Sequence, residues 1–190
     1  MNYAVEFTTR KILCIHILCN MVKYISFDPA IRNCAYAKMN IDDENKISDL
    51  TFDIFDLTNN KKVLKCSFEE IISNLLWNLK LLNCDDVDMV LIENVPSMKN
   101  PMLKSVSICI YVYYLNLGYN VKLISPNTKP DEIKKCKTYN ERKKKSIELG
   151  LNLLNENDKI KIQRYKKQDD ITDCIIACKS YHDKINKLHN

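Results

Sequence analysis

Three short segments near the start of the chain have the residue pattern of β-strands. They cover residues 23–28, 34–41 and 47–55. In the third segment every second residue from Leu50 to Ile54 is apolar, which is the period of a strand with one buried face. Because only short turns separate the three segments, we expect an antiparallel meander.

The pattern then changes to a helical period. Ser67 and Glu70 form an S-x-x-E capping box, and apolar residues recur at helical spacing behind it as far as Leu82. Residues 87–92 are almost continuously apolar, as expected of a central strand that is covered on both faces. The later elements are expected at residues 102–117 (a helix ended by Gly118), 121–125 (a strand), 141–154 (a helix) and 169–187 (a helix).

This order predicts an α/β fold with a mixed five-stranded sheet flanked by helices. Three antiparallel strands come first, and two helix-linked strands follow. The 190 residues contain two glycines and no repeat, so we expect residues 21–190 to form a single domain. Residues 1–20 precede the first strand and are expected to be an N-terminal extension, a type of segment that is often flexible.

Composition and charge narrow the class of protein only slightly. Lys and Arg number 29 against 24 Asp and Glu, and the basic residues crowd into residues 134–145 and 159–167. A nucleic-acid-binding surface and an ordinary solvated surface explain this equally well. The nine cysteines include no C-x-x-C pair, which favours a reducing intracellular compartment over a disulfide framework. The apolar segment 106–117 is shorter than the ~20 residues that span a bilayer, so we expect a soluble protein without a membrane partner.

Acidic residues stand at the points where elements end or begin. Asp28 ends the first strand, Glu93 follows the buried run directly, and Asp170 and Asp173 share one face near the start of the last helix. Each acid alone has an ordinary explanation as a turn residue or a helix N-terminal residue. Together they suggest a metal site, because neighbouring buried carboxylates repel one another unless a cation compensates them. Oxygen ligands alone suit Mg²⁺ or Mn²⁺.

The residues around these acids carry a family resemblance. The three motifs are ISFDPAIRNCAYA, LIENVP and KKQDDITDCIIAC, around Asp28, Glu93 and Asp170 respectively. In this order they resemble the motifs of the RuvC-like Holliday junction resolvases of poxviruses and other large DNA viruses, which have the ribonuclease H-like fold. The resemblance covers residues 21–181. One departure is Ala30, which stands where the family has glycine.

The resemblance implies a role for individual residues. Asp28, Glu93, Asp170 and Asp173 would be the catalytic, metal-binding acids, and Lys129 and Lys144 the catalytic basic residues. Lys143 and Lys145 are so close to Lys144 that the choice among the three stays open, and Asp169 could replace Asp170. The implied cofactor is Mg²⁺, with Mn²⁺ as a substitute, two ions per active site and no small-molecule cofactor.

The resemblance also implies a reaction and partners. The enzyme would be a homodimer that nicks opposed strands of four-way DNA junctions in viral replication and recombination, leaving 5′-phosphate ends. If it is poxvirus-like, it would act in the cytoplasm. The dimer surface is expected on the helix after Glu93, and the alternative is that these residues are internal core. They are Ile108, Ile110, Val112, Tyr113 and Tyr114.

Two other functions are compatible with the sequence. One is a different ribonuclease H-like nuclease, acting on RNA–DNA hybrids or on flaps and other branched DNA. The other is a module that binds branched DNA without cutting it, although clustered negative charge is of no use to a pure phosphate binder. Substrate preference separates the first from a resolvase, and the absence of cleavage identifies the second.

Overall fold

The computed structural model describes residues 21–82, 84–96 and 100–189. The predicted N-terminal extension, residues 1–20, lies outside the described residues. Among the described residues, no helix is both long enough and apolar enough to cross a membrane.

A five-stranded mixed sheet forms the centre of the molecule. Its strands are β1 (Met21–Asp28), β2 (Cys34–Asp42), β3 (Ile47–Phe55), β4 (Met89–Glu93) and β5 (Val121–Ile124). Their order in the sheet is β3-β2-β1-β4-β5. The first three pair antiparallel, whereas β4 runs parallel to both β1 and β5. The predicted meander and helix-linked strands are therefore confirmed.

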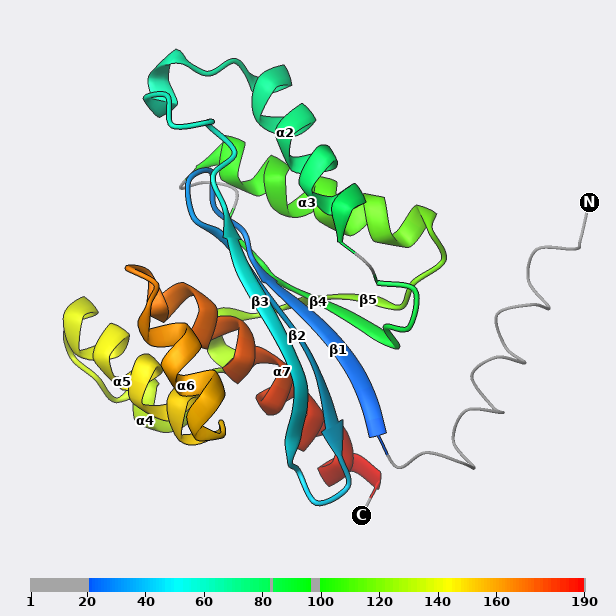
Figure 1. Ribbon diagram of the computed structural model, residues 1–190, viewed down its shortest axis with the longest axis vertical. Coiled ribbons are helices and arrows are strands. Elements are labelled where there is room, and N and C mark those ends of the chain that lie inside the picture. The colour runs from blue at the N-terminus through cyan, green and yellow to red at the C-terminus, as the bar shows by residue number, and fades with distance from the viewer. Residues whose placement is uncertain (1–20, 83, 97–99, 190) are drawn as a thin grey trace, which may run out of the picture.

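Helices cover the two faces of this sheet (Figure 1). On one face lie α2 (Phe68–Leu81) and α3 (Pro101–Asn116). On the other lies α7 (Gln168–His189), with α4 (Asp131–Lys134), α5 (Tyr139–Asn152) and α6 (Glu156–Gln163) beside it. Each face has its own apolar core, and strand residues alternate between the two cores because successive side chains of a strand point to opposite faces.

The predicted signals at the helix ends are present. The Ser67 hydroxyl accepts a hydrogen bond from the Glu70 amide at 3.2 Å, and the Glu70 carboxylate accepts one from the Ser67 amide at 3.1 Å, which completes the capping box of α2. Gly118 follows α3 with φ +83°, a conformation that favours glycine. The short helices α4 and α6 were not predicted, because neither is long enough to display a helical period.

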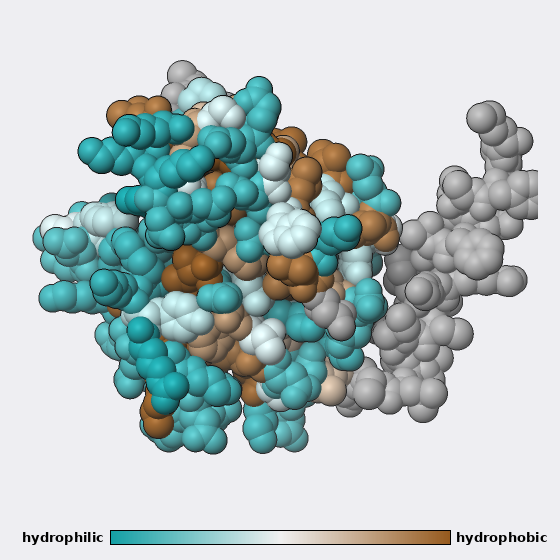
Figure 2. Space-filling view, turned by 45° about the horizontal axis from the view of Figure 1, so that its top comes forward, coloured by the Kyte–Doolittle hydropathy of each residue, from teal (hydrophilic) through white to brown (hydrophobic). Residues whose placement is uncertain are grey.

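The residues of α3 that were expected to form a dimer surface lie partly in the core and partly on the surface. Ile110 and Tyr114 are fully buried in the core beneath α3, so for these two residues the prediction of a dimer surface was wrong. Ile108 and Val112 are exposed, at 38% and 44%. With Leu115 they form a stripe at helical spacing that faces away from the sheet. Figure 2 shows hydrophobic residues of one face as separate patches within a mostly hydrophilic surface.

Candidate active site

The sheet brings Asp28 and Glu93 to the same edge and the same face. β1 and β4 are parallel neighbours in which Phe27 is paired with Ile92, so the next residue of each strand is one of the two acids. Phe27 and Ile92 belong to the core under α2 and α3. Because side chains alternate along a strand, Asp28 and Glu93 face the opposite side of the sheet, where α7 packs.

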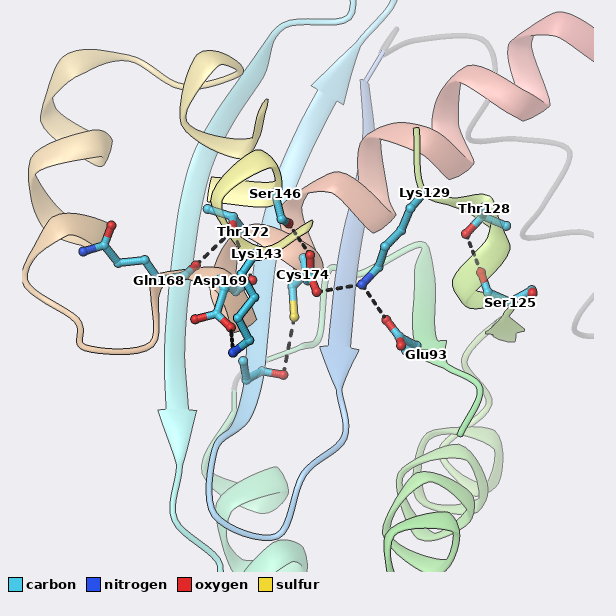
Figure 3. A network of polar contacts seen from close by, with 12 residues as sticks. Glu93, Ser125, Thr128, Lys129, Lys143, Ser146, Gln168, Asp169, Thr172 and Cys174 are labelled. Atoms are coloured by element: carbon cyan, nitrogen blue, oxygen red, sulfur yellow. Dashed lines mark hydrogen bonds and ion pairs between the residues drawn. The ribbon is translucent and has the colours of Figure 1, made fainter. Parts of the chain in front are cut away.

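Helix α7 supplies the other acids on that face, and Lys129 joins them to the sheet. The Lys129 ammonium lies 2.6 Å from Asp173 Oδ2 and 3.3 Å from Glu93 Oε2 (Figure 3). A short turn after β5 holds Lys129 in place: the Thr128 hydroxyl donates to the Ser125 carbonyl at 2.7 Å. Lys129 therefore lies between two of the predicted catalytic acids, as its proposed role requires.

The charges of the other three predicted acids act on Asp28. Burial, together with the negative charges of Glu93, Asp173 and Asp170, raises the pKa of Asp28 well above its ordinary value. Burial lowers the pKa of Lys129, but the carboxylates of Asp173 and Glu93 outweigh this effect, so the pKa of the ammonium lies above its ordinary value. The site thus concentrates negative charge that Lys129 compensates only in part.

Asp169 and Asp170 interact with each other, and their surroundings bear on the choice between them. Asp169 is 8% exposed and accepts a hydrogen bond from the Lys143 ammonium (Figure 3). Burial tends to raise the pKa of Asp169, but Lys143 holds it below its ordinary value. Burial and the adjoining Asp169 carboxylate raise the pKa of Asp170 to about 6. Lys143 binds Asp169, whereas the charge of Asp170 acts on Asp28, so the arrangement favours Asp170 as the member of the acidic site.

The basic residues of α5 lie on different faces of the helix, and one of these faces contacts α7. Lys143 and Ser146 are three residues apart and both contact α7, where the Ser146 hydroxyl donates to Asp173 (Figure 3). Lys144, the residue chosen from the resemblance, is exposed, and Lys145 forms an ion pair with Glu148 at 2.6 Å. The contacts therefore bring Lys143, and not Lys144, to the acids. Ser146 was missed, although a helical wheel through Lys143 would have placed it on the same face.

Helix α5 lies unusually close to α7 at one point. A Cβ atom added at Gly150 would be 2.5 Å from Thr172 Cβ and 2.8 Å from Thr172 Cγ2. Glycine, which has no Cβ atom, is therefore needed at this position.

The backbone at Ala30 does not require glycine, because Ala30 does not have a positive φ. The described residues with positive φ are Asn45, Asp49, Asn59, Asn60 and Gly118.

The donor set fits a divalent cation, although the cluster is not preformed. Among the residues that the structure describes, no three acid, histidine or cysteine side chains stand together in a ready arrangement for a metal ion. Lys129 lies between Glu93 and Asp173 instead. The acids nevertheless offer only oxygen ligands, and burial together with neighbouring negative charges raises the pKa of Asp28, an effect that a cation would oppose.

Known proteins resemble the chain in sequence and in fold. A family model described as Poxvirus A22 protein matches residues 21–184. The crystal structure of Fowlpox virus resolvase with substrate Holliday junction DNA is similar with a TM-score of 0.62 and 22% identity, over 86% of this chain and 99% of that chain. A search of curated protein sequences gave no match.

Two further solved structures have the same architecture. Thermus thermophilus RuvC in complex with a Holliday junction substrate matches with a TM-score of 0.60 and 14% identity, over 87% of this chain and 96% of that chain. The yeast mitochondrial Holliday junction resolvase Ydc2 matches with a TM-score of 0.54 and 12% identity, over 93% and 85%. These likenesses confirm the predicted ribonuclease H-like fold.

Proposed function

Because the chain belongs to the poxvirus A22 protein family, we propose that it is a Holliday junction resolvase, an endonuclease that nicks opposed strands of four-way DNA junctions. The observation that carries this proposal is that Asp28 and Glu93 end neighbouring strands on the face where α7 carries Asp170 and Asp173, with Lys129 between Glu93 and Asp173. A protein that only binds phosphate would gain nothing from such a concentration of negative charge.

The acids have a role that suits phosphodiester hydrolysis. Two Mg²⁺ ions, or Mn²⁺ in their place, would be held by Asp28, Glu93, Asp170 and Asp173 and would supply activation of water and neutralisation of negative charge. Lys129 is positioned to donate a hydrogen bond to a phosphate oxygen once it leaves the carboxylates, which stabilises the charge that develops during cleavage. The expected products carry 5′-phosphate and 3′-hydroxyl ends.

The pairing of α5 with α7 supports the geometry of the acids. The Ser146 hydroxyl fixes one oxygen of Asp173, and Lys129 binds the other. Lys143 binds Asp169, the residue that adjoins Asp170. We assign Ser146 and Lys143 as positioning residues and Lys129 as the catalytic lysine.

A homodimer would present two such sites to the two strands of a junction. A four-way junction has near two-fold symmetry, so an isologous dimer matches it. The exposed stripe of Ile108, Val112 and Leu115 on α3 is the apolar surface that we propose as part of the interface. A poxvirus-type enzyme of this kind would act in the cytoplasm on branched replication DNA.

Cleavage of a labelled junction tests the proposal. The protein and its Glu93→Gln variant are incubated in Mg²⁺ with a four-way DNA junction, a linear duplex of the same sequence and an RNA–DNA hybrid. We expect paired symmetric nicks on the junction alone, and a loss of rate of at least about 100-fold in the variant, because the variant lacks one negatively charged ligand. The variant should still bind the junction.

The controls separate the alternatives. Cleavage of the hybrid in preference to the junction would replace the resolvase by another nuclease of this fold, and a flap substrate added to the series would test the flap nuclease in the same way. Binding of the junction by both proteins without cleavage in Mg²⁺ or Mn²⁺ would contradict the nuclease proposal and leave a binding module.

A further inference from the structure

An exposed aromatic ring stands next to the acidic site. Tyr139 is the first residue of α5 and is 64% exposed, although tyrosine side chains usually bury much of their ring. The Lys143 ammonium lies 4.9 Å from the centre of the Tyr139 ring and also donates to Asp169. One ammonium group therefore separates the ring from the residue that precedes Asp170.

The ring is held on a rigid element. The Thr138 hydroxyl accepts a hydrogen bond from the Glu141 amide at 3.2 Å, and the Glu141 carboxylate accepts one from the Thr138 amide at 3.1 Å. This capping box fixes the first turn of α5, so the position of Tyr139 is set by the backbone. Lys143, one turn further along, fixes the ring from one side through its cation–π contact. The exposed remainder of the ring faces solvent.

The Lys143 contact accounts for one side of the ring, and nucleic acid binding would account for its exposed remainder. Aromatic side chains stack on unpaired bases whatever the base, since every base has a π-face. Exposed basic residues lie near Tyr139 in the sequence and would contact the phosphates on either side of such a base. They are Lys135, Lys137 and Arg142.

We propose that Tyr139 stacks on an unpaired base of branched DNA beside the acidic site, and that Lys143 is a positioning residue that holds the ring between this base and Asp169. The inference rests on the proposed resolvase function and adds to it a residue that recognises the opened branch point. An intact duplex has no unpaired base to offer, so Tyr139 contributes to the preference for branched over linear DNA.

A fluorescent base reports the contact directly. 2-Aminopurine is placed in turn at each position that flanks the crossover of a four-way junction, and the full-length protein is added in Ca²⁺ to prevent cleavage. Stacking on a ring quenches 2-aminopurine, so we expect Tyr139→Leu to be at least twofold brighter than wild type at one of these positions. Tyr139→Phe keeps the ring and should match wild type.

Affinity and a second variant give independent readouts. Tyr139→Leu should bind the junction about 5- to 150-fold more weakly, as expected for the loss of one stacked base, with linear duplex affected much less. Lys143→Met should show an intermediate fluorescence, and Lys143→Arg should restore the wild-type signal. Ile160→Ala, which removes another exposed apolar side chain (50% exposed), is the matched control and should change neither readout.

The outcomes distinguish this inference from the function on which it rests. If wild type cuts junctions while Tyr139→Leu matches it in fluorescence at every position and in affinity, the stacking role is wrong and the resolvase proposal stands. If wild type neither binds nor cuts junctions, both are wrong. Unchanged thermal midpoints of the variants exclude misfolding as the cause of a loss.

Discussion

At the scale of single residues, Lys129 compensates the negative charge of the acidic site. It forms ion pairs with Glu93 and Asp173 and is 20% exposed, so its charge compensates acids that would otherwise repel one another. A cation that binds these acids must replace Lys129 there. Lysine and divalent cation thus compete for the same oxygen atoms, and release of the lysine makes it available to a phosphate.

Lys129→Met should therefore change stability and cation binding in opposite directions. We expect the free energy of unfolding without divalent cations to fall by about 1–3 kcal/mol, less than the ~3–5 kcal/mol of a fully buried pair because the lysine is partly exposed. Added Ca²⁺ should raise the thermal midpoint more in the variant than in wild type. Differential scanning fluorimetry measures both effects. Lys122→Met, at an exposed position of β5, is the control, and an equal Ca²⁺ response in all three proteins would contradict the competition.

Residue types and spacing alone predicted the acids but not all of their partners. Asp28 and Glu93 follow apolar strands, and that signal is local in the sequence. The choice of Lys143 over Lys144 depends on the rotation of α5 against α7, and three successive lysines carry no information about that rotation. Tyr139 had no signal of its own, because its position beside Asp169 results from the same packing.

At the scale of elements, the contact of α5 with α7 depends on Gly150. The glycine lets the helices approach closely enough for Lys143 and Ser146 to contact Asp169 and Asp173. Any side chain there would push the helices apart and move these contacts.

Gly150→Ala should destabilise the protein despite alanine's higher helix propensity. The new Cβ would be 2.5 Å from Thr172 Cβ, and overpacking of this kind costs about 1–3 kcal/mol, against a propensity gain of roughly 1 kcal/mol. Urea unfolding measures the net loss, and junction cleavage should slow as well. Thr172→Ser in the same chain should recover only part of the loss, because it removes Cγ2 but keeps Cβ. A more stable Gly150→Ala variant would mean that the helices separate at no cost.

The stability of the packing of α7 on β1 should depend on pH through His182. His182 is 3% exposed, and its Nδ1 lies 3.1 Å from the Tyr24 hydroxyl. Burial lowers the pKa of His182, so the folded protein favours the neutral ring. The unfolded chain takes up a proton near pH 6.5, and the stability contributed by the neutral ring is therefore present above about pH 6.5 and lost as pH falls towards the lowered pKa.

His182→Gln should remove this dependence. Chemical unfolding at pH 7 and pH 5 should show that wild type loses more stability than the variant, with a difference in slope of at most about 1.4 kcal/mol per pH unit. Only the difference between the two curves is diagnostic, because the carboxylates titrate in both proteins. Parallel curves would show that His182 is not kept neutral by burial.

At the scale of the whole molecule, affinity for DNA should depend strongly on salt. In the proposed complex the exposed basic residues around α5 would neutralise phosphates and release counterions, an effect that is independent of sequence. Lys137→Ala should weaken junction binding at low salt and reduce the slope of log K against log salt by about 0.9. Fluorescence anisotropy over a salt series measures this slope. Lys184→Ala, near the C-terminal end of α7 and away from the acids at its start, should leave the slope unchanged.

Most of the architecture was predictable because its elements are long or strongly periodic. The alternation in β3, the capping box of α2 and the apolar run of β4 each fix an element without reference to the rest of the chain. The burial of Ile110 and Tyr114 was not predictable, because α3 is apolar on most of its surface and its period does not show which side meets the sheet. Only packing against β4 and β5 settles that question.

The distribution of the acids along the chain has a consequence for protein synthesis. A ribosome completes β1 and β4 long before α7, so a growing chain contains Asp28 and Glu93 without Asp170 and Asp173. Such a chain lacks two of the four acids of the proposed site. If the proposed nuclease acts through these acids, its activity would begin only after α7 has been synthesised and has docked, and nearby nucleic acid would be safe from copies that lack α7.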